Sequence, residues 1–277
     1  MTRTVHDDLG DTVTVPERPE RVVSLVPSLS EVLWWWRLAD RMVGVTDWCV
    51  APPRAFDHAR RVRGTKNPDV GAVVALEPDL VVANEEENRE LDVRRLREAG
   101  VAVYVTRVRT VAEAADVLAR LGAVLGVERA AQELRASILR ALGALPVEQP
   151  PLATFCPVWR DPWMATGRAT FAGDLLARCG FGVVPAEPDA RYPQVELEEV
   201  AEADPEVVLL PDEPYRFETR DRAAFAEWRA RVRLVDGTAL TWWGPRTPHA
   251  VGELARLARS LRRSVKRGRP GGRPRGW

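Results

Sequence analysis

A helical stretch in the middle of the chain constrains the fold more than any other feature. Thr110 and Glu113 have the spacing of a capping box, and apolar residues follow at helical intervals up to Leu125. After a glycine break, a second amphipathic pattern starts at Glu128 and ends before Pro146. At 1.5 Å per residue the second helix is roughly 27 Å long, enough to cross a small domain. Such a helix in mid-chain favours two parts joined by a helical spine.

The segments before and after these helices carry the same pattern. Residues 74–83 read as a helix end, a stop at Pro78 and a short apolar strand, and residues 200–210 repeat this order around Pro205. An apolar run after a helix-stopping proline is typical of a parallel strand covered on both faces. We therefore predict an α/β fold with two parallel-sheet lobes, a long helical spine and a ligand cleft between the lobes. The predicted parts are an N-terminal arm at 1–20, a first α/β lobe at 21–125, a connecting helix at 126–147, a second α/β lobe at 148–262 and a basic disordered tail at 263–277.

Within the lobes, strands and helices are expected to alternate. Residues 21–26 predict the first central strand, and Ser28 with Glu31 predicts a capping box at the next helix. We expect Trp34, Trp35 and Trp36 to serve mainly in core or lobe packing. Other expected elements are an edge strand at 12–16, strands at 42–46, 80–83, 101–105, 152–155, 207–210 and 232–235, and a charged helix at 221–231.

Composition excludes several classes of protein. The 277 residues carry 40 Lys+Arg and 40 Asp+Glu, which does not favour a general nucleic-acid surface. Three cysteines without CxxC spacing and three distant histidines predict neither a disulfide framework nor a zinc site. The printed start has no apolar leader and no later window resembles a membrane span, so the chain as given is expected to be cytoplasmic. The basic tail is either a solubilising extension or an arm for lipids or acidic partners.

Aromatic residues gather in the loops that follow the predicted strands. In open α/β sheets ligands lie at the carboxyl ends of the strands, so these loops would line the cleft. Flat apolar surfaces suit a bulky organic ligand better than a small ion. Trp48 has two open interpretations, a cap on the core or a ligand platform. The loop aromatics are Trp48, Trp159, Trp163, Tyr192, Tyr215, Trp242 and Trp243.

Several segments in order resemble the helical-backbone substrate-binding proteins, which serve ABC importers of cobalamin, iron-siderophores and heme. These segments are residues 21–31, 44–53 and 76–81 and the central helix, and the resemblance covers residues 12–262. It is strongest to the cobalamin-binding branch: Trp48 and Tyr192 match pocket aromatics of that branch, Trp242 and Trp243 lie in its last cleft loop, and residues 163–168 resemble its second-lobe loop.

The resemblance implies a binding protein without catalytic residues, metal ligands or cofactor, whose ligand is a corrinoid or another tetrapyrrole or metal chelate. It implies a monomer that works with an ABC permease or as a cytoplasmic stand-alone relative. Family members dock through one Glu on each lobe; Glu198 matches the second position, whereas the first falls on Gly71. The expected ligand contacts are Ser28, Trp48, Trp163, Tyr192, Trp242, Trp243 and Arg246.

Two alternatives stay open. A siderophore or heme binder of the same fold would use arginines for anionic groups, or Tyr192, Tyr215 or His249 for iron. A cytoplasmic enzyme is the alternative from another class, although no known catalytic motif occurs and the acid pairs Glu85/Glu86 and Asp212/Glu213 read as solvated loop charges. The arginines in question are Arg160, Arg168, Arg191 and Arg246.

Overall fold

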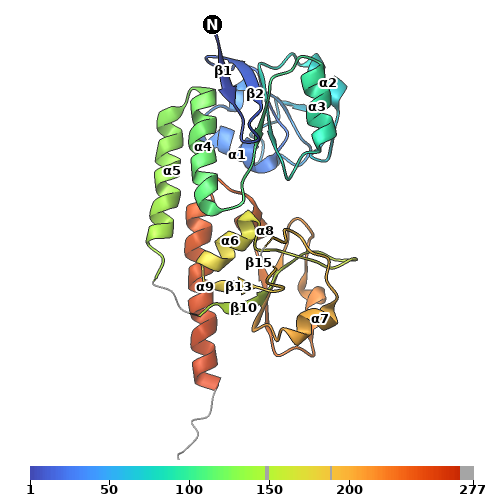
Figure 1. The fold of residues 1–277 in the computed structure, drawn as a ribbon, viewed down its shortest axis with the longest axis vertical. Helices are drawn as coiled ribbons and strands as arrows, with labels where there is room; N and C mark the ends of the chain where they lie inside the picture. The colour runs from blue at the N-terminus through green and yellow to red at the C-terminus, as the bar shows by residue number, and fades with distance from the viewer. Residues whose placement is uncertain (147–149, 188, 269–277) are drawn as a thin grey trace, which may run out of the picture. The chain divides into compact units, whose positions relative to one another are not determined.

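The computed structural model describes residues 1–146, 150–187 and 189–268 and divides into two compact units (Figure 1). Unit 1 comprises Met1–Leu139 and Trp242–Thr247, and unit 2 comprises Arg140–Thr241 and the chain from Pro248 onward. Each unit contains a parallel sheet with helices, which confirms the predicted α/β class. The return of the chain to unit 1 at Trp242–Thr247 differs from the predicted boundaries, which place this segment in the second lobe.

The sheet of unit 1 has five parallel strands in the order β5-β4-β3-β8-β9. The central strand β3 and its neighbour β8 are buried along their whole length. Apolar side chains of the strands pack with Val73 of α2 and Leu96 of α3 to form the core. The strands are β3 (Val22–Ser24), β4 (Met42–Val45), β5 (Arg60–Arg61), β8 (Leu80–Asn84) and β9 (Val103–Thr106), and the helices are α1 (Pro27–Trp35), α2 (Val70–Ala75), α3 (Glu90–Glu98) and α4 (Val111–Leu125), with a short helix η1 (Ala39–Arg41) and a small hairpin of β6 (Arg63–Gly64) and β7 (Asn67–Pro68).

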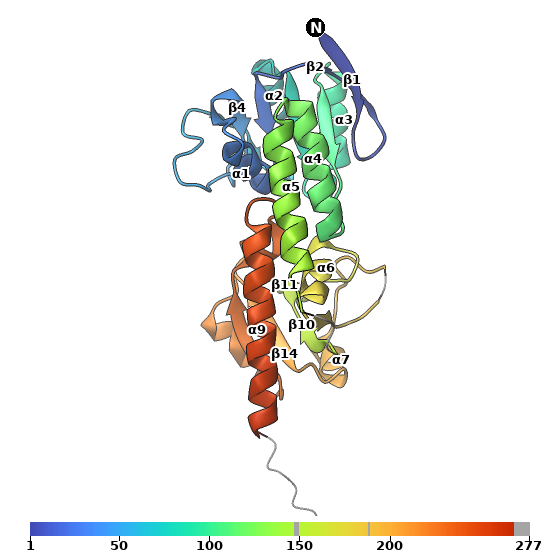
Figure 2. The ribbon, with the colours of Figure 1, turned by 90° about the vertical axis from the view of Figure 1, so that its left-hand side faces the viewer.

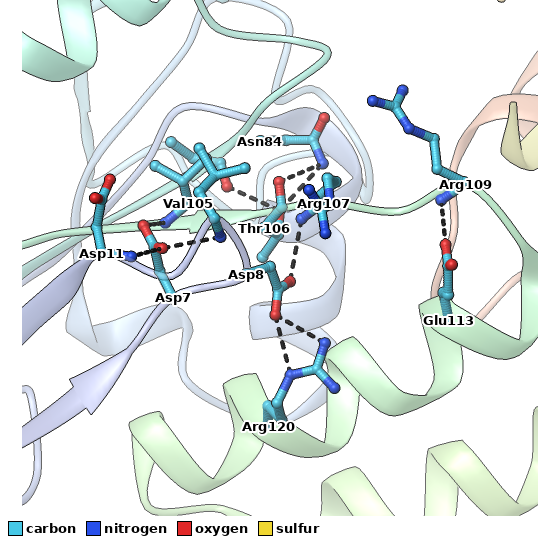
Figure 3. A network of polar contacts seen from close by, with 12 residues as sticks. Asp7, Asp8, Asp11, Asn84, Val105, Thr106, Arg107, Arg109, Glu113 and Arg120 are labelled. Carbon is cyan, nitrogen blue, oxygen red and sulfur yellow. Dashed lines mark hydrogen bonds and ion pairs between the residues drawn. The ribbon is translucent and has the colours of Figure 1, made fainter. Parts of the chain in front are cut away.

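An N-terminal hairpin occupies the predicted arm. Its strands, β1 (Thr2–His6) and β2 (Thr12–Pro16), pair only with each other, so residues 12–16 form a strand but not an edge of the main sheet. The hairpin loop is bound to β9 instead (Figure 3): the Asp8 amide donates to the Val105 carbonyl at 3.1 Å, and the Asp8 carboxylate accepts from the Arg107 amide and the Arg120 guanidinium. Backbone and carboxylate together attach the hairpin to the strand end.

Unit 2 is built on four parallel strands in the order β13-β10-β14-β15. Its core is rich in rings, with Phe155 and Phe225 in edge contact at 6.0 Å and Trp228 against both. Strand β13 has no counterpart in the sequence prediction, because three residues are too few to show the alternation of apolar and polar residues that marks a strand. The strands are β10 (Leu152–Phe155), β11 (Pro157–Trp159), β12 (Met164–Ala165), β13 (Phe181–Val183), β14 (Val207–Pro211) and β15 (Arg231–Val235), and the helices are α6 (Phe171–Arg178), α7 (Leu197–Glu202), η2 (Thr219–Phe225) and α8 (Gly237–Thr241).

The central helical stretch folds as predicted. The Thr110–Glu113 capping box is present at α4, and Gly126 with a φ of 71° ends this helix. Helix α5 (Glu128–Gly143) lies beside α4, and the two approach so closely at Gly122 that a Cβ there would collide with Ala131 (Figures 1 and 2). Residue 147 of the predicted connecting helix lies outside the described residues.

The last helix, α9 (Thr247–Gly268), is followed by residues 269–277, where most of the predicted basic tail falls and which lie outside the described residues. None of the helices in the described part of the chain is both long enough and apolar enough to cross a membrane.

Three local predictions are wrong. Helix α1 begins at Pro27 with Val26 as N-cap and no side-chain cap, because proline at the first position sets the helix start ahead of Ser28. Of the three adjacent tryptophans only Trp36 is buried, while Trp34 and Trp35 are 39% and 56% exposed, since neighbouring helical residues point in different directions. The predicted helix at 221–231 is the shorter 3-10 helix η2, which ends when the Phe225 ring enters the core.

Candidate functional site

Trp48 lies in the turn after β4, at the carboxyl edge of the unit 1 sheet. Its side chain is 64% exposed, which excludes the core-cap interpretation. Three hydrogen bonds fix this turn. The Arg61 guanidinium donates to the carbonyls of Thr46 and Cys49 at 2.9 and 3.0 Å, and the Ser30 hydroxyl donates to the Cys49 sulfur at 3.0 Å. The indole is therefore presented to solvent by a fixed backbone.

Ser28 lies in the first turn of α1, which follows β3. Strand β3 is the neighbour of β4 in the sheet, and Trp48 follows β4. Ser28 is buried, so little of its hydroxyl faces solvent. The structure thus places Ser28 at the expected edge without exposing it as the prediction implied.

The thiols of unit 1 and unit 2 are all free and buried. Burial raises the pKa of Cys49, and it raises the pKa of Cys156 and of Cys179 to about 12. Desolvation of the thiolate is the leading cause in each case.

We expect the native protein to resist thiol reagents at pH 8. With a pKa of about 12, only on the order of one Cys156 or Cys179 in 10⁴ is a thiolate at that pH, whereas an exposed cysteine is ionised to roughly a quarter. Titration with a chromogenic disulfide should release three equivalents rapidly in denaturant and almost none in buffer. Rapid release of one equivalent from the folded protein would contradict the burial of these thiols.

The ends of β8 and β9 are joined by a polar network (Figure 3). The Asn84 side-chain amide donates to the Thr106 hydroxyl at 3.1 Å, and its oxygen accepts from the Glu86 amide at 2.9 Å. Glu85 receives a hydrogen bond from Arg109 at 2.8 Å, so this acidic loop is folded and paired rather than freely solvated as predicted. These contacts stabilise the loop after β8 as part of the edge.

The segment Trp242–Thr247 belongs to unit 1, and its aromatic rings are not exposed as predicted. Trp242 and Trp243 are 7% and 6% exposed. A Cβ at Gly244, where φ is 148°, would collide with Val32 of α1, which shows how closely the segment lies on that helix. The two tryptophans therefore act in packing in this structure.

Arg246 is engaged by a carboxylate 215 residues away in the chain. Its Nε donates to both Glu31 carboxylate oxygens at 2.9 and 2.8 Å, and its guanidinium lies 5.1 Å from the centre of the Trp242 ring. The Glu31 side chain is 12% exposed and the Arg246 side chain 34%, so the ion pair is only partly screened by water. Glu31 thus neutralises much of the charge that the prediction assigned to an anionic ligand group.

In unit 2, Trp163 and Tyr192 lie on two segments that are hydrogen-bonded to each other. The Gly167 amide donates to the Arg191 carbonyl at 2.7 Å, the Ala165 amide to the Pro193 carbonyl at 2.9 Å, and the Val195 amide to the Trp163 carbonyl at 3.0 Å. The structure therefore brings these two predicted residues into one local framework, with both side chains half-buried.

Trp163 is held by ring contacts. It lies parallel to Phe217 at 5.9 Å and meets Phe225 edge-on at 5.6 Å. The Arg160 guanidinium lies 5.5 Å from the Trp163 ring centre, and Arg160 is fixed by an ion pair with Asp221, whose side chain is 1% exposed. Trp163 is thus part of the wall of the core.

An aromatic pair of unit 2, Trp159 and Tyr215, includes a ring that is more exposed than Trp163. Trp159 is 44% exposed and meets Tyr215 edge-on at 5.5 Å, and Tyr215 lies 4.6 Å from buried Phe217. Trp159 lies four residues after β10, as Trp48 lies three residues after β4, and this parallel placed it among the loop aromatics of the sequence analysis but not among the expected ligand contacts.

Metal ligation was also considered for this chain. Within residues 1–146, 150–187 and 189–268, no three His, Cys, Asp or Glu side chains group as metal ligands would. His249 is exposed on α9, 3.8 Å from Glu253.

The two docking positions occupy equivalent places in the units. Helices α2 and α7 are each six residues long, and each precedes an apolar strand, β8 or β14. Gly71 and Glu198 are the second residues of these helices, and both are exposed. Unit 1 therefore lacks a carboxylate at the place where unit 2 presents one, and docking stays a prediction.

Known proteins share this architecture. Residues 22–227 match the sequence model of a family described as periplasmic binding protein. The vitamin B12-binding protein of Vibrio cholerae serotype O1 is 24% identical over 260 residues, which cover 91% of this chain and 92% of that protein.

Two solved structures have the same fold. The periplasmic vitamin B12 binding protein of Vibrio cholerae has a TM-score of 0.76 at 23% identity, over 89% of this chain and 99% of its own. The periplasmic heme-binding protein of Roseiflexus sp. RS-1 also has a TM-score of 0.76, at 21% identity, over 87% and 98%. The fold is thus common to proteins described as binding two different tetrapyrrole-type ligands.

Proposed function

Because this chain belongs to the periplasmic binding protein family, we propose that it is the substrate-binding protein of an ABC importer and that its ligand is a corrinoid of the cobalamin type. The observation that carries the proposal is Trp48, a large apolar ring held in the open by a fixed turn at the ligand-binding edge of a parallel sheet. A ligand that covers this ring removes apolar surface from water, which is favourable for binding. A corrin ring presents an extended conjugated face on which an indole can stack.

The similarity to vitamin B12-binding proteins supports the corrinoid over other flat ligands. It extends over nine-tenths of both chains, so it is not confined to one motif. We propose binding without a chemical step, since the matched family is one of binding proteins and the acidic loop at Glu85 is engaged in an ion pair.

Heme is the second candidate, and one observation favours it. The heme-binding protein of Roseiflexus matches the fold as well as the vitamin B12 binding protein does, and the Tyr215 phenol at the edge of unit 2 is a chemically competent iron ligand. A heme-loaded protein would show a Soret band that shifts when Tyr215 is replaced by phenylalanine.

Titration calorimetry with cyanocobalamin and hemin tests the proposal. We expect cyanocobalamin to bind at micromolar or lower concentration, and Trp48→Ala and Tyr192→Ala each to lose about 1 kcal/mol or more of binding free energy. Trp35→Ala is the matched control, because it removes an indole that is 56% exposed, against 64% for Trp48, from the last turn of α1. If the protein bound hemin saturably and did not bind cyanocobalamin, the proposed ligand would change from a corrinoid to heme. If it bound neither compound, the proposed function would be refuted.

The cellular location of the protein depends on whether it works with a membrane permease. The solved relatives are described as periplasmic, so they give no support to the cytoplasmic location expected from the printed start. We propose that exposed Glu198 contributes to permease docking. Fractionation of cells that express the native gene would locate the protein.

A further inference from the structure

Trp159 combines exposure with a position at the carboxyl edge of unit 2. It is the last residue of β11, where it pairs with Met164 of β12. Its backbone is therefore set by a hairpin while its side chain stays 44% exposed. This ring therefore stands on an ordered backbone near the carboxyl ends of parallel strands, where ligands bind in open α/β sheets.

The ring is also held from behind. Tyr215 meets it at 5.5 Å with an interplanar angle of 76°, and Tyr215 in turn lies 4.6 Å from Phe217, which is buried in the core of unit 2. Edge-to-face contacts of this kind favour one orientation of the indole. The exposed ring thus rests on a stack of rings that begins in the core.

Arg160, which follows Trp159 in the chain, is held by an ion pair. Arg160 forms an ion pair with buried Asp221, and Asp221 also accepts from the Glu218 amide at 2.7 Å. A residue anchored to a buried carboxylate limits the motion of its neighbour. Because Asp221 neutralises Arg160, this edge favours an aromatic ligand face over a free anion.

We infer that Trp159, backed by Tyr215, is a ligand-contact residue of unit 2 that stacks on the flat conjugated face of a tetrapyrrole-type ligand. The inference rests on the proposed function and adds a residue to it. Trp163, which the sequence predicts for this role, packs parallel to Phe217 within the wall and serves as a positioning residue. A pre-ordered ring loses little conformational entropy when the ligand arrives, so its contribution to affinity is large.

Calorimetric titration of four proteins tests the inference: the full chain, Trp159→Ala, Trp159→Phe and Trp35→Ala, each with cyanocobalamin and with hemin. For the ligand that the full chain binds, we expect Trp159→Ala to weaken binding at least tenfold and Trp159→Phe to stay within about threefold. Trp35→Ala should stay within twofold, because Trp35 lies on α1 away from the strand ends. Calorimetry avoids the change in intrinsic fluorescence that each substitution causes.

The outcomes separate the two proposals. Binding by the full chain that Trp159→Ala leaves within twofold would overturn the inference alone. Equal losses from Trp159→Ala and Trp35→Ala would overturn it too, since they would indicate a general effect of removing a surface indole. Binding of neither compound by the full chain would overturn both the proposed function and the inference that rests on it.

Discussion

Replacing Asp7 by alanine is expected to lower the free energy of unfolding of unit 1 by about 3 kcal/mol. The Asp7 carboxylate is fully buried and accepts four hydrogen bonds: from the amides of Leu9 and Asp11 at 2.9 Å each, from the Val105 amide at 3.3 Å and from Arg97 at 2.7 Å. Alanine leaves the three backbone amides without this acceptor and removes the Asp7 contact between the hairpin loop and β9 (Figure 3), while Arg97 keeps its bonds to Asp11 and to the Val103 carbonyl. Urea unfolding followed by circular dichroism, with hydrogen exchange of residues 103–106, measures the loss.

Asp11→Ala is the matched control for this prediction. Asp11 also pairs with Arg97, at 2.6 Å, but its side chain is 55% exposed. An exposed pair contributes little, so we expect a loss below about 1 kcal/mol. Equal effects of the two substitutions would show that burial of Asp7 does not govern the attachment of the hairpin.

Replacing Gly167 by alanine is expected to destabilise unit 2 by about 2–3 kcal/mol and to weaken ligand binding at the same time. A Cβ at Gly167 would collide with the backbone carbonyl groups of Ala190 and Arg191, which cannot move aside as a flexible side chain could. These carbonyls belong to the segment hydrogen-bonded to residues 165–167. Forcing the two segments apart would displace Trp163 and Tyr192 from their common framework. Thermal unfolding and cyanocobalamin titration of the same sample measure both effects.

Gly143→Ala serves as the comparison for the glycine substitution. Gly143 ends helix α5 with no atom in the way of a Cβ, so alanine there should leave stability unchanged or raise it by a few tenths of a kcal/mol. If Gly167→Ala were as stable as Gly143→Ala and bound ligand normally, the close approach at residues 190 and 191 would not be needed for the site.

Much of the fold follows from local patterns. The Thr110–Glu113 capping box and the strands after Pro78 and Pro205 are in place, because capping, proline stops and apolar runs act over a few residues. Local rules fail where two of them compete. At α1 the proline at the first helical position overrides the Ser28–Glu31 spacing, and Glu31 becomes the partner of Arg246 instead.

The candidate site was predicted less completely than the fold. Trp48 is exposed at the expected edge, whereas Trp242 and Trp243 are buried and Trp159 is more accessible than Trp163. All five residues are tryptophans in segments that the sequence predicts as loops, so composition and position along the chain cannot separate them. What separates them is the packing around each ring.

By itself, the sequence determined the α/β class, most strands of the two main sheets, the central helices and the enrichment of aromatic residues in the loops predicted after strands, since periodicity, capping and composition are local properties. Only the tertiary structure decided which of those rings face solvent and which charges are already paired. Exposure of Trp159 depends on Tyr215, and the charge of Arg246 depends on Glu31, 215 residues away. Burial and ion pairing are set by contacts between distant segments, and no local pattern records which segments will meet.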